Sequence, residues 1–157
     1  SGKATMIGIA TGMVAGLATI TPASGTVGPA GALLIGFMAG IVCFYATQAV
    51  KSYFKIDDSL DVFPVHGVGG ILGIIMLAIV GNPDGFLGSG ASGISEDGVI
   101  AQLVIQLQGV FIICAYTALI TYVILKVLNT FIEVRVTNEQ EDIGLDMSEH
   151  NEQGYSL

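Results

Sequence analysis

The sequence has 157 residues, of which 52% are hydrophobic and only 11% are charged, whereas soluble domains carry about 25% charged residues. The net charge of −8 argues against a nucleic-acid-binding surface. With its positive mean hydropathy and 22 glycines, the sequence is typical of an all-α membrane protein.

The apolar residues gather in runs long enough to cross a membrane. A hydrocarbon core about 30 Å thick needs about 20 apolar residues in a helix. Four runs meet that length, at residues 4–21, 26–50, 61–80 and 99–128. We therefore predict a transmembrane region over residues 1–132 and a cytoplasmic tail over residues 133–157. Because the sequence does not begin with Met, we also expect it to be the later part of a longer chain.

Small residues recur every four positions in the first two spans. They are Gly8, Gly12 and Gly16, followed by Gly28, Ala32, Gly36 and Gly40. Such stripes let membrane helices approach closely, so we expect them to be packing faces. The turn formers at residues 21–25 carry no charge, which predicts an antiparallel hairpin of these two spans. Cys43 and Cys114 have no other ligand at metal-binding spacing, so we expect both to be packing residues.

The third span begins with an acidic cluster and contains one imidazole, that of His66. In a soluble core such a ring is often structural, neutral and bonded to a backbone carbonyl. In a membrane, an ionisable side chain is a functional hypothesis by default. Asp61 has two interpretations: an N-cap that accepts from the amide of Phe63, with Pro64 tolerated in the first turn, or a direct contact with a substrate.

The basic residues predict the orientation of the chain. With four crossings, all five lie at or beside the same side of the membrane: Lys3, Lys51, Lys55, Lys126 and Arg135. The positive-inside rule places that side, and with it both ends of the chain, in the cytoplasm. The loop at residues 81–98 is then predicted to lie outside.

The tail from Thr137 onward contains acids and no lysine or arginine. This composition is typical of a solvated, disorder-prone end. The apolar side chains within residues 143–147 interrupt the acids, and we expect that they can dock on another surface.

Three separated motifs resemble one family in the same order. They are the string Asp-Ser-Leu-Asp-Val-Phe-Pro-Val-His-Gly-Val-Gly-Gly at residues 58–70, Ile-Thr-Pro-Ala-Ser-Gly at residues 20–25, and Glu-Gln-Glu with Gly-Leu-Asp in the tail. Together they resemble the C-terminal part of the ammonium transporter family (Amt/Mep/Rh), and the likeness runs over nearly the whole chain.

The resemblance implies a fold and a function. The full protein would be an eleven-span inverted-repeat helical bundle, assembled as a homotrimer with one pore per subunit, that conducts ammonium or ammonia without a cofactor. These four spans would be its last four. His66 would match the second of two pore-lining histidines, and Asp61, Val62 and Phe63 would match the residues that lead into it. The first pore histidine belongs to earlier spans that this sequence does not contain.

The resemblance also implies a regulatory role for the tail. Gly144, Leu145, Asp146 and His150 would match a cytoplasmic segment that contacts the neighbouring subunit and responds to PII-type signalling proteins. Two departures weaken parts of the match, since Pro64 and Asn151 stand where the family often has glycine. Two alternatives stay open: an ammonium sensor built on the same scaffold, and a structural membrane subunit in which His66 only bonds between helices. None of the three is an enzyme.

Overall fold

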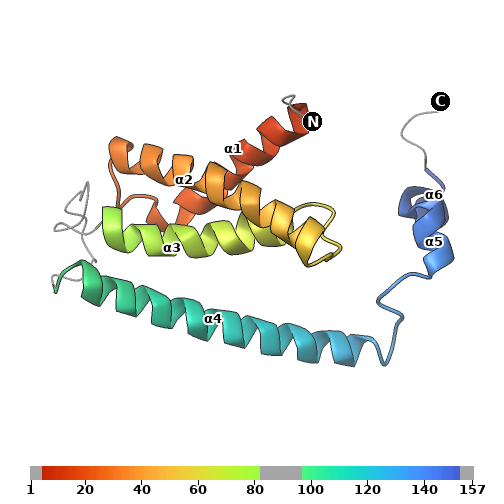
Figure 1. The fold of residues 1–157 in the computed structure, drawn as a ribbon. Helices are drawn as coiled ribbons and strands as arrows, with labels where there is room; N and C mark the ends of the chain where they lie inside the picture. Colours follow the sequence, from red (N-terminus) through yellow and green to blue (C-terminus); the bar gives the residue numbers. More distant parts are fainter. Residues whose placement is uncertain (1–4, 82–96, 153–157) are drawn as a thin grey trace. The chain divides into compact units, whose positions relative to one another are not determined.

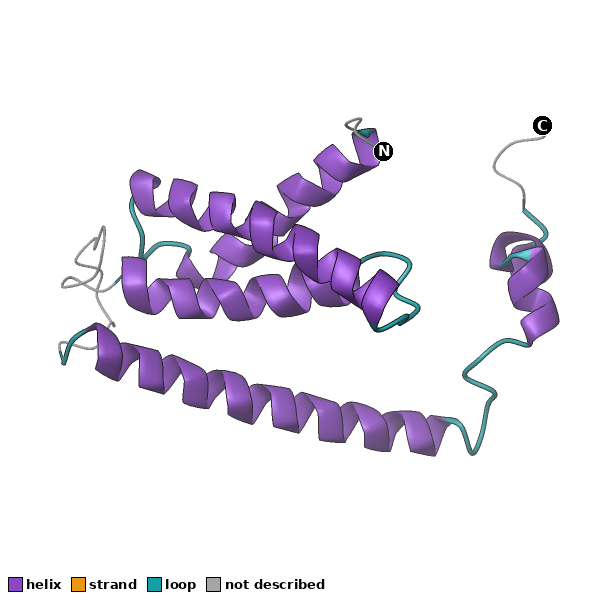
Figure 2. Cartoon of the chain, in the orientation of Figure 1, coloured by secondary structure: helices purple, strands orange, loops and turns teal. Residues whose placement is uncertain are grey.

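The computed structural model describes residues 5–81 and 97–152, and these are helical with connecting turns and no strands (Figures 1 and 2). The α-helices are α1 (Met6–Ile20), α2 (Pro29–Gln48), α3 (Gly69–Val80), α4 (Val99–Leu128), α5 (Asn138–Ile143) and α6 (Leu145–His150). The chain divides into two compact units, Ser1–Ile112 and Ile113–Leu157, and each is described by itself.

Four helical stretches are long and apolar enough to cross a membrane, as the sequence predicts. They are Met6–Ala23, Pro29–Tyr53, Phe63–Val80 and Val99–Leu128. The first ends two residues later than predicted because a 3₁₀ turn, Thr21–Ala23, continues α1. The second begins three residues later, since Pro29 stands in the first turn, where its missing amide costs no helical hydrogen bond. Most of the predicted outer loop, residues 82–96, lies outside the described residues.

Helices α1, α2 and α3 pack together in the first unit, and α1 lies obliquely to α3 (Figure 1). One cluster of buried side chains contains Ala23, Ile35, Met76 and Val80, and a second contains Ala15, Cys43 and Val65. The three helices therefore meet through small and medium-sized side chains, which bring their backbones close together. Cys43 is buried and forms no disulfide, in agreement with its predicted packing role, whereas Cys114 is exposed in this chain and its packing role stays a prediction.

The repeats of small residues in the first two spans are predicted to be packing faces, and this prediction is wrong for the contacts made inside the first unit. A β-carbon added at the glycines of these stripes beyond Gly8 would meet no heavy atom within 4 Å; these are Gly12, Gly16, Gly28, Gly36 and Gly40. The buried face of α2 is instead displaced by one residue along the helix and consists of Gly31, Ile35, Ala39 and Cys43. The tightest contact on this face is at Gly31, where an added β-carbon would lie 2.4 Å from Cγ1 of Val80.

The second unit contains two short helices where composition predicts a disorder-prone end. A capping box begins α5: Thr137 accepts from the amide of Gln140, and Gln140 Oε1 accepts from the amide of Thr137. Gln140 Nε2 also donates to Glu149 of α6 at 2.7 Å. These reciprocal bonds satisfy amides that a helix start leaves free, so the acidic composition does not prevent local order. The disorder prediction is wrong for residues 138–150.

Candidate functional site

The candidate site begins where the chain turns from the second span into the third. The second span ends in a π-helical segment, Ala49–Tyr53, and the third begins with another, Phe63–Val68. Between them, Lys55 and Asp61 have positive φ angles of 52° and 56°. The left-handed conformation is unfavourable for side chains other than glycine, asparagine and aspartate. The turn thus has a defined backbone that depends on side-chain contacts to hold it.

Asp58, and not Asp61, caps the third span. Its Oδ1 accepts from the amide of Val62 and its Oδ2 accepts from the amide of Phe63, both at 2.9 Å. The prediction that Asp61 accepts from Phe63 is therefore wrong. The carbonyl of Asp61 does accept the first helical bond, from the amide of Val65 at 3.0 Å, but its left-handed backbone leaves the capping role to the earlier acid.

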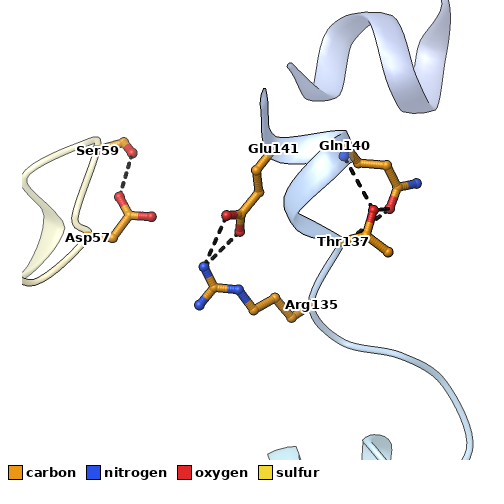
Figure 3. Close-up of polar contacts among 6 residues, drawn as sticks. All are labelled: Asp57, Ser59, Arg135, Thr137, Gln140 and Glu141. Carbon is orange, nitrogen blue, oxygen red and sulfur yellow. Dashed lines mark hydrogen bonds and ion pairs between the residues drawn. The ribbon is translucent and has the colours of Figure 1, made fainter. Parts of the chain in front are cut away.

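The carboxylate of Asp61 pairs with Lys51 instead. Lys51 Nζ lies 2.8 Å from Asp61 Oδ1, and the two side chains are 45% and 17% exposed. This ion pair joins the end of the second span to the start of the third. A fully exposed pair contributes about 0–1 kcal/mol, and the smaller exposure of Asp61 reduces the screening of this one. Beside it, Ser59 Oγ donates to Asp57 at 3.1 Å (Figure 3).

His66 lies on the wall of a cavity of about 260 Å³ between α1 and the start of the third span. The other lining residues are Ile7, Ala10, Thr11 and Val14 from α1, with Leu60 and Val65. His66 is exposed in this chain, and it belongs to the π-helical segment Phe63–Val68. Such segments are frequent at functional sites because they reorient side chains that a regular α-helix would direct elsewhere. The imidazole therefore faces a largely apolar space with one hydroxyl in it.

Asp61 lines a different cavity, of about 340 Å³, also within the first unit. Its polar lining comes from Thr5, Thr11, Thr47 and Asp61. Thr11 is the residue common to this cavity and to that of His66, apart from the apolar Ile7. The structure thus brings Asp61 and His66 to two neighbouring cavities and not to one.

Val62 and Phe63 do not line either of these two cavities. Their side chains are 53% and 58% exposed. The Phe63 ring lies over Gly67, where an added β-carbon would come within 3.1 Å of the ring. Both residues precede His66 in the sequence, and their apolar side chains are exposed in this chain.

Sequence reasoning missed Asp58 and Thr11. Asp58 stands four residues before the first amide that it caps, one place outside the usual N-cap spacing, so the acid nearest to Pro64 is the better candidate by sequence alone. Thr11 lies within an apolar run, and only its position in space associates it with Asp61 and His66.

The predicted regulatory residues lie together on the two short helices of the second unit. Gly144 joins α5 to α6 with a φ of 95°, and Leu145, Asp146 and His150 belong to α6. The apolar side chains of Ile143, Leu145 and Met147 are all exposed in this chain. Ahead of these helices, Arg135 Nη2 contacts both carboxylate oxygens of Glu141, at 2.8 and 3.2 Å (Figure 3). The unit thus exposes apolar side chains on a small structure held by polar bonds.

Residues 5–81 and 97–152 contain no group of three or more His, Cys, Asp or Glu side chains that could hold a metal ion. The chemistry that the described site offers is that of one imidazole, several hydroxyls and a paired carboxylate next to apolar walls.

Comparison with known proteins shows relatives over the whole chain. The model of the Ammonium Transporter Family matches residues 1–155. The chain is 40% identical over 156 residues to an "Ammonium transporter" of Aquifex aeolicus, and the match covers 99% of this chain and 36% of that relative. It is 40% identical over 156 residues to "Ammonium transporter Amt1" of Archaeoglobus fulgidus, covering 99% of this chain and 38% of the relative.

A solved structure agrees with these sequence matches. The structure of a "Sensor Amt Protein" superimposes with a TM-score of 0.77 and 31% sequence identity, over 90% of this chain and 34% of the other. The chain thus spans a little over a third of the length of the two curated relatives described above.

Proposed function

The chain belongs to the Ammonium Transporter Family, and we propose that it forms the last four spans of a protein that conducts ammonium or ammonia across the cell membrane. The relatives are named transporters, and the chain itself is a multi-pass, all-α membrane protein. The eleven-span inverted-repeat bundle and the homotrimer are part of the proposal, and they rest on the family resemblance.

The position of His66 is the observation that carries the proposal. Moving a small cation from water into an apolar channel costs free energy because the ion loses its hydration. This cost is far larger than the gain from one neutral hydrogen bond, which contributes about 0.5–1.5 kcal/mol. Transfer of the proton to a base, either water or the unprotonated nitrogen of a neutral imidazole, leaves neutral ammonia and avoids most of this cost. A neutral imidazole donates from one nitrogen and accepts at the other, so His66 can bond to ammonia within the apolar cavity that it lines.

Asp61, Val62 and Phe63 supply the approach to this imidazole in the proposal. Val62 and Phe63 offer apolar surface that favours a neutral species over an ion. Asp61 lies in the neighbouring cavity with three threonines, where hydroxyls and a carboxylate suit a species that still keeps hydrogen-bond donors. Both cavities have largely apolar walls with a few hydrogen-bonding groups, which supports a site where a donor-rich cation gives way to a neutral molecule.

The tail carries the proposed regulation. Gly144, Leu145, Asp146 and His150 lie on a compact unit with exposed apolar side chains, which is what a docking segment needs. We propose that it contacts a neighbouring subunit and couples the pore to a PII-type signalling protein at the cytoplasmic face. The basic residues near the ends of the spans favour a cytoplasmic tail.

Flux through the complete protein, reconstituted in liposomes, tests the role of His66. We expect His66→Ala to lower ammonium flux per assembled protein at least tenfold, and His66→Glu to change the selectivity between ammonium and other monovalent cations. Val68→Ala is the matched control, since Val68 belongs to the same π-helical segment and does not line the cavity. Normal flux and selectivity in both His66 variants would refute the pore assignment.

A sensor is the second candidate, and the similarity of the chain to the solved "Sensor Amt Protein" favours considering it. A sensor binds ammonium and signals through its tail without steady turnover. Steady ammonium current from the complete wild-type protein would support the transporter, whereas saturable binding without current would support the sensor.

A further inference from the structure

The backbones of α1 and α3 come closest where Thr19 meets two glycines. A β-carbon added at Gly73 would lie 2.0 Å from the carbonyl oxygen of Thr19 and 3.2 Å from Cδ of Pro22. One added at Gly69 would lie 2.8 Å from Oγ1 of Thr19 and 3.3 Å from Sγ of Cys43. Thr19 is completely buried. A side chain at Gly73 would therefore push the two helices apart or rotate one of them, and one at Gly69 would displace the side chain of Thr19 or have the same effect.

The close contact is confined to one face of α3. Gly70 lies between these two glycines in the sequence, and a β-carbon added there would meet no heavy atom within 4 Å. Gly69 and Gly73 are four residues apart, so they lie one turn apart on the same side of the helix. This side is the one that faces α1, and its lack of side chains sets how α3 is rotated about its own axis.

His66 lies just before this contact on the same helical stretch. Val65, Gly69 and Gly73 are buried at four-residue spacing and form this face, whereas His66 follows Val65 and is exposed, so it lies beside the face and not on it. The cavity that it lines is walled by Ile7, Ala10, Thr11 and Val14, which belong to the part of α1 that precedes Thr19. The same two helical stretches thus touch at Thr19 and leave a space beside the earlier part of α1, where His66 lines the cavity.

A small rotation of α3 would move the imidazole by a large amount. A helix with its side chains has a radius of about 5–6 Å, so a rotation of about 20° displaces a side-chain tip by about 2 Å. Functional groups act within about 0.5 Å of their productive position. A change in the contact at Thr19 is therefore large enough to decide whether the ring faces α1.

We infer that Thr19, Gly69 and Gly73 are positioning residues that fix the rotation of α3 and thereby hold His66 against the Thr11 wall of α1. The effect on conduction rests on the function proposed above for His66. The positioning itself does not, because it concerns only where the ring lies.

The contacts at the two glycines differ in a way that gives a rescue experiment. At Gly69 the nearest obstacle is Oγ1 of Thr19, which Thr19→Ala removes, and the remaining close atom is Sγ of Cys43 at 3.3 Å. At Gly73 the obstacle is the backbone oxygen of Thr19, which no substitution at that position removes. Thr19→Ala is thus expected to restore normal crosslinking and flux to Gly69→Ala, and not to Gly73→Ala. Gly70→Ala is the matched control, since it adds the same methyl group to the same helix in open space.

Two measurements on the complete protein in liposomes test the inference. The first is the yield of a short thiol crosslinker between cysteines placed at Thr11 and His66, in a Cys114→Ser background. The second is ammonium flux per assembled protein and its pH profile, with the native His66. For Gly69→Ala and Gly73→Ala we expect at least a threefold change in crosslinking and a fivefold loss of flux with an altered pH profile. For Gly70→Ala we expect crosslinking and flux within twofold of the wild-type values. Adding Thr19→Ala to Gly69→Ala is expected to return both quantities to that range.

The outcomes separate this inference from the proposed function. Unchanged crosslinking in Gly69→Ala and Gly73→Ala would overturn the inference. A lower amount of assembled protein with normal flux and pH profile would also overturn it when His66→Ala does lose flux. Restoration of Gly73→Ala by Thr19→Ala would also overturn it, because the backbone contact would then be irrelevant. Altered crosslinking together with normal flux in His66→Ala would support the positioning while refuting the pore role of His66.

Discussion

Replacing Asp58 is expected to release the start of the third span. Both carboxylate oxygens accept an amide at 2.9 Å, from Val62 and from Phe63. Hydrogen bonds to charged groups contribute about 1.5–3 kcal/mol each, and the loss of a helix cap costs about 0.5–2 kcal/mol. Because these bonds are exposed, the smaller range for a cap applies, and because Asp58 accepts from two amides we expect Asp58→Ala to destabilise the span by about 2 kcal/mol, the upper end of that range. Asp58→Asn keeps one acceptor oxygen, so we expect about half that loss.

The chain contains a matched control for this prediction. Asp57 carries the same charge one residue earlier, and its carboxylate accepts from the hydroxyl of Ser59 at 3.1 Å. Asp57→Ala thus removes the same charge without removing a cap. The assay is unfolding of the complete protein in mixed micelles with increasing denaturant, followed by hydrogen exchange at the amides of Val62 and Phe63. Equal stability and equal exchange in Asp57→Ala and Asp58→Ala would refute the capping argument.

Two further predictions concern the tail and the orientation. Leu145→Asp should leave the protein assembled while weakening the docking of the tail about tenfold or more, since it buries a charge at an apolar contact; Leu145→Met is the conservative control. The measurement is flux with and without a PII-type protein, and unchanged responses would show that the tail is passive. For the orientation, in a Cys114→Ser background, Ser59→Cys should react with a membrane-impermeant thiol reagent only from the cytoplasmic side and Asp97→Cys only from outside. Labelling in the reverse sense would invert the topology.

The sequence is sufficient to predict the four spans because apolar runs of this length have few other uses. Backbone amides in lipid need partners within their own segment, so composition nearly determines helix and location. The boundaries are predicted less well. Thr21–Ala23 extends the first span as a 3₁₀ turn, and Ala49–Tyr53 extends the second as a π-helix. Both extensions depend on hydrogen bonds that apolar composition does not encode.

The cap of the third span shows how a local rule fails in an irregular turn. The rule assigns the cap to the residue whose carbonyl accepts the first helical bond, and by that rule Asp61 is the right choice. The positive φ of Asp61 changes the direction of its side chain, which then pairs with Lys51 across ten residues of sequence. Neither the left-handed backbone nor the distant lysine can be inferred from the motif around the acid.

The prediction of disorder in the tail is wrong because it considers the acidic composition and not the residues that cap the helices. Acidic composition disfavours a packed core, but a six-residue helix needs only its terminal amides satisfied and a few local bonds. Thr137 and Gln140 provide the first, and the bond from Gln140 to Glu149 joins the two helices. The Thr-x-x-Gln spacing of a capping box is present in the sequence and is the signal that could have predicted this order.

The glycines show why a packing face is harder to predict than a span. Regular four-residue spacing makes Gly12, Gly16, Gly36 and Gly40 the apparent contact residues, yet a β-carbon at each would meet open space. Gly31 and Gly73 belong to neither predicted stripe, yet they make the tightest contacts. A stripe shows only that a helix face is able to approach a neighbour, and the crossing point of two helices decides which glycine is needed. Because Gly73 lies seven residues after His66 in the same helical stretch, this glycine, which belongs to neither predicted stripe, has the most direct physical link to the proposed site.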